Sequence, residues 1–142
     1  MRRTSSNSKG AAHEKRAKEI LEAQGHLVHK TVHSSLFKTQ WGWRRTAAND
    51  ILGCFDLLAI SAHSPPMLIQ ITDDTMSSGS SGNRKVKIDT LVPFVPAGIR
   101  VQLWAWHGAR TDQFFRVYER GLCLEWKKVY DIGRKGIRKV YQ

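Results

Sequence analysis

Two short apolar runs, each interrupted by polar residues, constrain the fold of this chain most strongly. One run is FDLLAI at residues 55–60, and the other is MLIQIT at residues 67–72. Their aliphatic and β-branched residues predict two strands, and the turn-forming residues 64–66 join them as a hairpin. A carboxylate within an apolar strand is costly unless it is paired or binds a metal. Asp56 is therefore the first candidate for a functional residue.

The charge of the chain narrows the class of partner. Its 142 residues carry a formal net charge of +11, which favours a polyanionic partner, nucleic acid before an anionic membrane surface. No apolar run approaches the roughly 18 residues of a membrane span, and residues 1–9 lack the apolar core of a secretory signal. Cys54 and Cys123 are too few for a disulfide framework. We expect a single domain in the cytoplasm, without membrane contact.

The N-terminal third predicts one helix that follows a basic mobile arm at residues 1–8. Ser8 is a plausible N-cap, and the helix runs to about Gln24 with Gly25 as its stop. At about 100° per residue, Glu14 falls on the same side as the small and apolar residues of the helix. That side comprises Gly10, Glu14, Ala17, Leu21 and Gln24. Glu14 is thus the one acid on the packed face.

The remaining elements alternate between strands, loops and a second helix. Further strands are predicted at 26–32, 99–106, 114–118 and 122–126, with a loop or hairpin at 33–49. Residues 73–83 read as a flexible Gly/Ser-rich loop, residues 84–92 as a helix that Pro93 ends, and residues 132–142 as a basic tail. This order predicts an α/β domain with one mixed sheet flanked by helices.

Four polar positions of these elements form a candidate metal site. Period-2 alternation puts Gln70 and Thr72 on one face of their strand, and Asp56 lies in the neighbouring strand. Glu14 lies on the inward face of the helix that would cover the sheet. Two carboxylates, an amide oxygen and a backbone carbonyl such as that of Ile71 are hard ligands that suit Mg²⁺ or Mn²⁺. Beside a DNA phosphate, such an ion polarises the phosphoryl oxygen and generates hydroxide for in-line attack.

The same residues carry a family resemblance, which spans roughly residues 10–106. Its motifs are Gly10-x-x-x-Glu14, Gly25, Phe55-Asp56-Leu57-Leu58-Ala59 and Ile69-Gln70-Ile71-Thr72. They resemble the PD-(D/E)xK, restriction-endonuclease-like nucleases, nearest to archaeal-type Holliday-junction resolvases and related phage-encoded proteins. The resemblance implies a Mg²⁺-dependent endodeoxyribonuclease that is often a homodimer and acts on branched DNA such as four-way junctions. By position, Glu14 matches the helix acid, Asp56 the central metal ligand and Gln70 the second acid.

The chain departs from the family pattern in its third motif. The family usually has Lys two residues after the second acid, to position or activate the attacking water, and here that residue is Thr72. Thr72 brings no positive charge, and Gln70 removes one negative charge from the metal site. Lys85 or Lys87, on the following helix, can take the missing Lys role, and Asp50 can restore a carboxylate. A catalytically inactive nuclease-fold DNA-binding protein is therefore the main alternative function.

Basic and aromatic residues outside this site are candidates for DNA contact. The segment 41–45 interleaves aromatics with cations, which suits stacking and phosphate contact, although a hairpin packed on the core has the same pattern. The full set of candidates is Arg2, Arg3, Lys9, Trp43, Arg44, Arg45, Arg84, Lys135 and Arg138. An RNA-binding protein is a weaker reading, because the expected RNA motifs are not evident.

Structural explanations remain open for each site residue. Asp56 can be a buried acid held by an arginine or by backbone N–H groups. Glu14 can pair with Lys18 one helical turn later. Gln70 and Thr72 can form a polar face of the sheet that is open to water.

Overall fold

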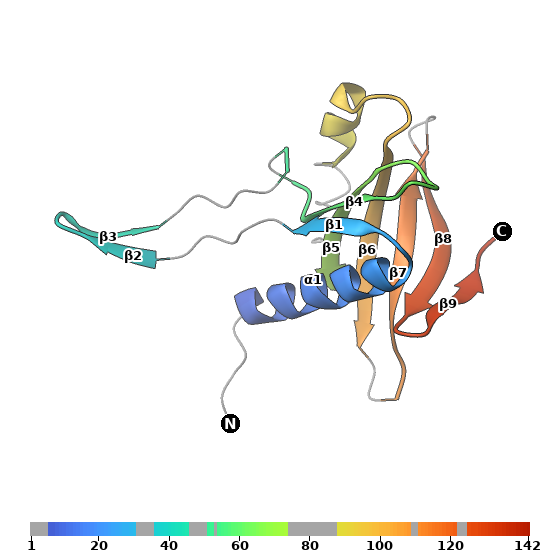
Figure 1. Cartoon of the computed structure of the whole chain (residues 1–142), viewed down its shortest axis with the longest axis horizontal. Coiled ribbons are helices and arrows are strands. Elements are labelled where there is room, and N and C mark those ends of the chain that lie inside the picture. Colours follow the sequence, from blue (N-terminus) through green and yellow to red (C-terminus); the bar gives the residue numbers. More distant parts are fainter. Residues whose placement is uncertain are drawn as a thin grey trace.

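The computed structural model describes residues 6–30, 36–45, 51–52, 54–73, 88–108, 111–121 and 125–142. In this part of the chain, a long helix lies across a seven-stranded sheet, and a two-stranded hairpin stands apart from it (Figure 1). The expected α/β class with one mixed sheet is confirmed.

The large sheet is antiparallel except at its centre. Its strands are β1 (Leu27–Lys30), β4 (Leu57–Ile60), β5 (Met67–Asp73), β6 (Arg100–Gly108), β7 (Gln113–Arg120), β8 (Trp126–Gly133) and β9 (Gly136–Val140), in the spatial order β1-β4-β5-β6-β7-β8-β9. Only β5 and β6 run parallel, and residues 74–99 connect them. Residues 88–91 of this connection are helical and lead into the 3₁₀ turn η1 (Val92–Phe94).

The helix α1 (Ser6–Ala23) covers one face of the sheet and packs against β1, β4 and β5. It begins two residues before the expected cap and ends close to the expected stop. Gly25 has a φ of +92°, a conformation that glycine adopts without strain, so it closes the helix as predicted. Ala17 and Leu21 are fully buried in a cluster with Ile69 and Ile71 of β5.

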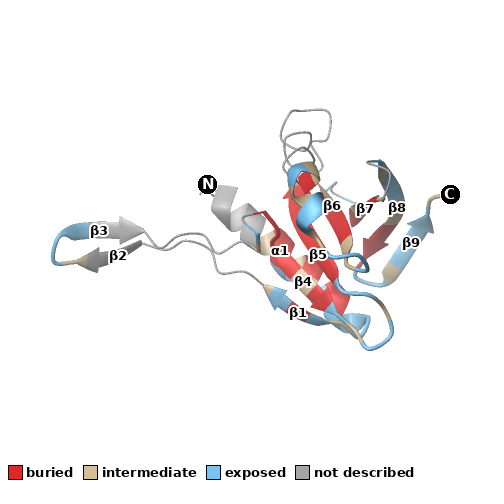
Figure 2. Ribbon diagram, turned by 90° about the horizontal axis from the view of Figure 1, so that it is seen from above, coloured by how far each residue is buried: buried red, intermediate tan, exposed pale blue. Residues whose placement is uncertain are grey.

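A second apolar cluster covers the opposite face of the same strands. Cys54, Phe55, Leu68, Ile88 and Val101 form it, so the helical residues of the β5–β6 connection lie across the sheet from α1. Figure 2 colours the central strands β5 and β6 largely as buried, in agreement with a cover on both faces. Because side chains alternate along a strand, β5 directs Ile69 and Ile71 to α1 and its even-numbered residues to the second cluster.

The hairpin pairs β2 (Leu36–Thr39) with β3 (Gly42–Arg45) as a separate sheet. Thr39 Oγ1 donates a hydrogen bond to the carbonyl of Gly42 at 2.8 Å, and Gly42 takes a φ of +109° in the turn. Trp41, at the tip, is 77% exposed. Of the two possibilities for residues 33–49, a hairpin is the one that forms, and its tip aromatic does not pack on the core.

Several boundaries differ from the expected ones. The strand expected to contain Asp56 begins only at Leu57, and Pro93 lies within η1 rather than ending the helical segment. Asp73 belongs to β5 and not to a loop. The expected basic tail at 132–142 is wrong, because these residues complete β8 and form β9.

Other expectations fall outside the part of the chain that the structure describes. They are residues 1–5 of the arm expected at 1–8, the Gly/Ser-rich loop from residue 74, and the start of the second helix at 84–87. The arm is wrong for residues 6–8, which belong to α1. Among the described helices, none is long and apolar enough to cross a membrane.

Candidate metal site and basic surface

Asp56 is bound to the backbone of β5 on both sides of Gln70. Its N–H donates to the carbonyl of Ile69, and its Oδ2 accepts from the N–H of Ile71, both at 2.9 Å. The side chain thus replaces a backbone acceptor where the β4–β5 ladder ends, because the chain before Leu57 turns away through a bridge between Ile51 and Phe55. This arrangement explains how a carboxylate that is only 7% exposed is tolerated here.

Gln70 lies beside Asp56 with its amide turned toward its own strand. Its Nε2 donates to the carbonyl of Ile71 at 3.1 Å, and its Oε1 accepts a long contact of 3.8 Å from the Cys54 thiol. The structure therefore brings together three of the four predicted ligands, Asp56, Gln70 and Ile71. The alternative of a water-facing polar surface is wrong for Gln70 and Thr72, since each is only 5% exposed.

Glu14 belongs to α1, which packs on the face of β5 that carries Ile69 and Ile71. It is 3% exposed on α1, as its helical position predicted, so it is not the surface partner of Lys18. Lys18 pairs instead with Glu22 at 3.5 Å. Since α1 covers the face that Ile69 and Ile71 share, Gln70 and Thr72 lie on the other face of β5 from the helix that carries Glu14.

The residues around Asp56 contain oxygen atoms of the kind that hard cations bind. Mg²⁺ binds through one or two carboxylates and completes its octahedron with waters and substrate phosphates. Asp56 supplies the carboxylate of this pattern, whereas the Gln70 amide turns its Nε2 to the Ile71 carbonyl and its Oε1 to the Cys54 thiol. No three His, Cys, Asp or Glu side chains of the described residues are placed to hold a metal, so this part of the chain contains neither a thiol- or imidazole-rich site nor a cluster of three carboxylates.

Several predicted residues cannot be placed relative to this site. Those outside the described ranges are Arg2, Arg3, Asp50, Arg84, Lys85 and Lys87. For four others only the backbone is described, with Lys9 in α1 and Trp43, Arg44 and Arg45 in β3. Their proposed roles stay predictions from the sequence.

The remaining two basic candidates lie on the β8–β9 hairpin, close to cations that the sequence did not single out. Lys135 is in its turn, and Arg138 of β9 forms an ion pair with Asp112. Across from them, Arg16 of α1 donates to Nδ1 of His13 at 3.0 Å and lies over the Trp106 ring at 4.8 Å from its centroid. The one sequence signal for this cluster is the spacing of His13 and Arg16, because residues three positions apart on a helix are neighbours on its surface.

Comparison with known proteins assigns no family to the chain. No protein-family model, no curated protein and no solved structure matches it.

Proposed function

We propose that this chain is a Mg²⁺-dependent endodeoxyribonuclease with a restriction-endonuclease-like fold, acting on branched DNA such as four-way junctions. The observation that carries the proposal is the pair of hydrogen bonds between Asp56 and β5, which holds the carboxylate beside Gln70 and the Ile71 carbonyl. A mixed sheet with helical layers on both faces agrees with the fold that the resemblance implies.

Asp56 and Ile71 lie together where the β4–β5 ladder ends, and they are the residues that would hold the ion. A bound Mg²⁺ supplies a Lewis acid there, which polarises a phosphoryl oxygen of the substrate. Asp56 provides the negative charge, and its bond to the Ile71 N–H fixes the direction of its carboxylate.

Proton transfer is the part of the reaction that these residues do not cover. Thr72 is buried and has neither a positive charge nor a pKa suited to accept a proton near neutral pH. Lys85 and Lys87 are the proposed substitutes. Replacing either residue by alanine should lower turnover and leave DNA binding unchanged. If both variants cut at the wild-type rate, neither Lys85 nor Lys87 activates the attacking water.

A second candidate function is supported by the same third motif. Gln70 already satisfies its amide within β5, and Thr72 is uncharged, so the fold can hold DNA without cutting it. In that case the +11 net charge supplies affinity through phosphate contacts, and Asp56 is a structural acceptor.

The test compares cleavage of a four-way junction and a matched linear duplex with Mg²⁺, Mn²⁺ or EDTA. Asp56→Asn is the informative variant, because the amide oxygen keeps an acceptor for the Ile71 N–H while the charge is lost. Glu22→Gln, an exposed acid of α1, is the matched control.

Metal-dependent cleavage that Asp56→Asn abolishes and Glu22→Gln retains supports the nuclease. Tight binding without cleavage under every metal condition rejects it in favour of the binding protein. The same preparations, measured by light scattering, test the proposed homodimer.

A further inference from the structure

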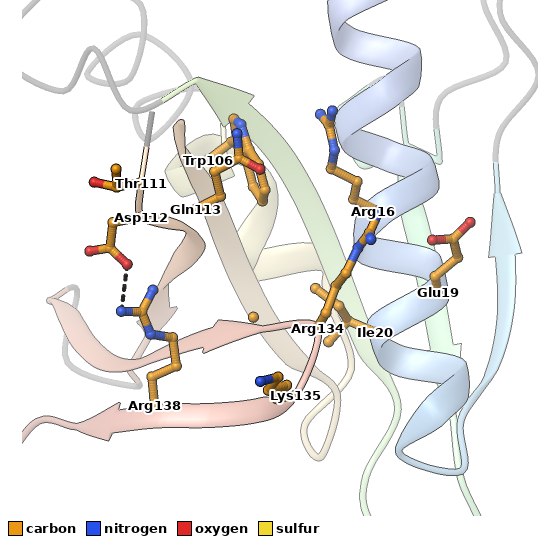
Figure 3. Close-up of a pocket in the computed structure, with 11 residues that line it drawn as sticks. Arg16, Glu19, Ile20, Trp106, Thr111, Asp112, Gln113, Arg134, Lys135 and Arg138 are labelled. Carbon is orange, nitrogen blue, oxygen red and sulfur yellow. Dashed lines mark ion pairs between the residues drawn. The ribbon is translucent and has the colours of Figure 1, made fainter. Parts of the chain in front are cut away.

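An open groove of about 530 Å³ runs between α1 and the β8–β9 hairpin. Figure 3 shows the side chains of α1 on one side of it and those of the β8–β9 turn and β9 on the other. Trp106, at the end of β6, and Ile20 of α1 contribute its apolar surface, and Gln113, at the start of β7, lies at its edge. This groove is formed by residues that the proposed metal site does not use.

The groove has an excess of positive charge. Four cations line it, and one of them, Arg138, is paired with Asp112. Among the described residues that line the groove, Glu19 is the one further acid beside the other three cations, Arg16, Arg134 and Lys135. Arg134 and Lys135 are exposed in the turn between β8 and β9, where an anion can reach them.

Arg16 is held in place on the wall of this groove. Its guanidinium is hydrogen-bonded to His13 and lies over the Trp106 ring, while His13 itself is buried against that ring at a centroid separation of 5.5 Å. A cation whose side chain is already fixed loses less conformational entropy when it binds an anion. This arrangement distinguishes Arg16 from a solvated surface arginine.

The combination of cations and apolar surface indicates the chemistry of the ligand. An inorganic anion would bind the cations but make no apolar contact with the Trp106 indole and Ile20. A nucleotide offers both a phosphate for the cations and an apolar base that can stack. The volume lies within the range of about 300–1,000 Å³ for small-molecule pockets, so single nucleotides fit and a duplex does not.

We propose that the groove binds an unpaired nucleic-acid strand, with its phosphates at Arg16, Arg134 and Lys135 and a base against the surface of Trp106 and Ile20. The choice of a strand over a free nucleotide rests on the proposed function, which it extends by naming unpaired segments as the part of branched DNA that the protein holds. Single-strand sites of this kind combine a basic groove with an aromatic platform.

The test measures the binding of a labelled oligothymidylate, a blunt duplex and a labelled mononucleotide by fluorescence anisotropy in EDTA. The groove variant is Arg134→Ala/Lys135→Ala. Its matched control is Lys15→Ala/Lys127→Ala, which removes two exposed cations outside the groove. Thermal unfolding verifies that both variants fold.

The groove variant should bind the single strand about tenfold more weakly than the control, and the slope of log K against log salt should shrink by about 1.4, or 0.7 for each lost phosphate contact. Arg16→Ala should lower affinity in the same direction. Equal affinities for the groove variant and the control overturn the proposal. If the groove variant loses equal affinity for the duplex and the single strand, the preference for an unpaired strand is overturned. If it loses affinity for the mononucleotide alone, the ligand is a free nucleotide instead.

This assay needs no cleavage, so the two proposals fail separately. If the wild type binds single strands through the groove but never cuts DNA, the nuclease is rejected and the groove remains. If metal-dependent cleavage requires Asp56 but the groove variant binds as the wild type does, the groove is rejected and the nuclease remains.

Discussion

At the scale of single residues, two substitutions separate the hydrogen bond of the Asp56 side chain from its negative charge. Asp56→Ala removes the acceptor of the buried Ile71 N–H, which should cost about 1–3 kcal/mol of unfolding free energy. Asp56→Asn keeps an acceptor and should lose less. Urea denaturation in EDTA gives both values, and equal losses for the two variants would show that the hydrogen bond does not stabilise the β4–β5 end.

His26 predicts a pH dependence of stability. Burial, and then the positive charge of Arg100, lowers the pKa of His26 below its ordinary value of 6.5. Between these two pKa values the unfolded chain binds more protons than the folded one, so stability falls as pH drops below about 6.5. At higher pH the residue is neutral in both states and contributes no pH dependence.

Replacing this side chain by an amide isolates its effect. His26→Gln should lose less unfolding free energy than the wild type between pH 7.5 and 5.5, as measured by urea denaturation at each pH. The exposed His63 supplies the control His63→Gln, which should follow the wild type. Parallel pH profiles for His26→Gln and the wild type would contradict this assignment.

At the scale of elements, Asp89 ties the helical residues of the β5–β6 connection to the sheet. Its Oδ1 accepts from Arg120 Nε of β7 at 2.7 Å and from Trp126 Nε1 of β8 at 3.1 Å. The Arg120 side chain is only 1% exposed, so losing its partner leaves a buried charge. The pair therefore fixes where this connection lies.

Asp89→Ala should lower the unfolding free energy by about 3 kcal/mol, the lower end of the range for buried pairs because Asp89 itself is 38% exposed. The control is Asp112→Ala, whose pair with Arg138 is roughly half exposed and should contribute less than about 1 kcal/mol. Chemical denaturation measures the unfolding free energy of both variants. Similar losses of unfolding free energy would show that the Asp89–Arg120 pair stabilises the fold no more than an exposed pair does.

Some elements could be predicted from the sequence because their pattern reflects their burial. β5 shows the aliphatic run of a strand covered on both faces, and α1 has one apolar side with a glycine stop. β9 was missed since it is an edge strand whose residues are mostly exposed, and such a strand needs no apolar alternation. The parallel pairing of β5 and β6 depends on a connection of 26 residues, whose path the local sequence does not specify.

The candidate site was predictable to a similar degree. Burial of Glu14 and Asp56 followed from helical spacing and from the strand run, whereas for Gln70 the sequence left burial and a water-facing sheet face open. The opposite placement of Glu14 and Gln70 did not, because it depends on which face of β5 the helix covers. The groove of Arg16 and Arg134 was also beyond local reasoning, since its walls come from α1 and from the β8–β9 turn, more than a hundred residues away.

At the scale of the whole molecule, the β2–β3 hairpin and the seven-stranded sheet are separate units. The two strands of the hairpin pair only with each other (Figure 1), and an isolated two-stranded hairpin is at best marginally stable in water. We therefore expect the hairpin to serve contact with a partner more than the stability of the sheet. It presents Trp41 at its tip, and its strands contain Lys38, Arg44 and Arg45.

Replacing residues 36–45 by Gly-Ser should therefore separate stability from binding. The unfolding free energy should change by no more than about 0.5 kcal/mol, as for other surface changes, while affinity for a four-way junction should fall because three cations and an exposed indole are lost. Trp41→Ala alone should keep the salt dependence of binding and lose affinity, since it removes stacking without charge. Denaturation and anisotropy titrations over a salt series measure both. A large loss of stability would mean that the hairpin contributes to the fold, and unchanged junction affinity would exclude it from DNA contact.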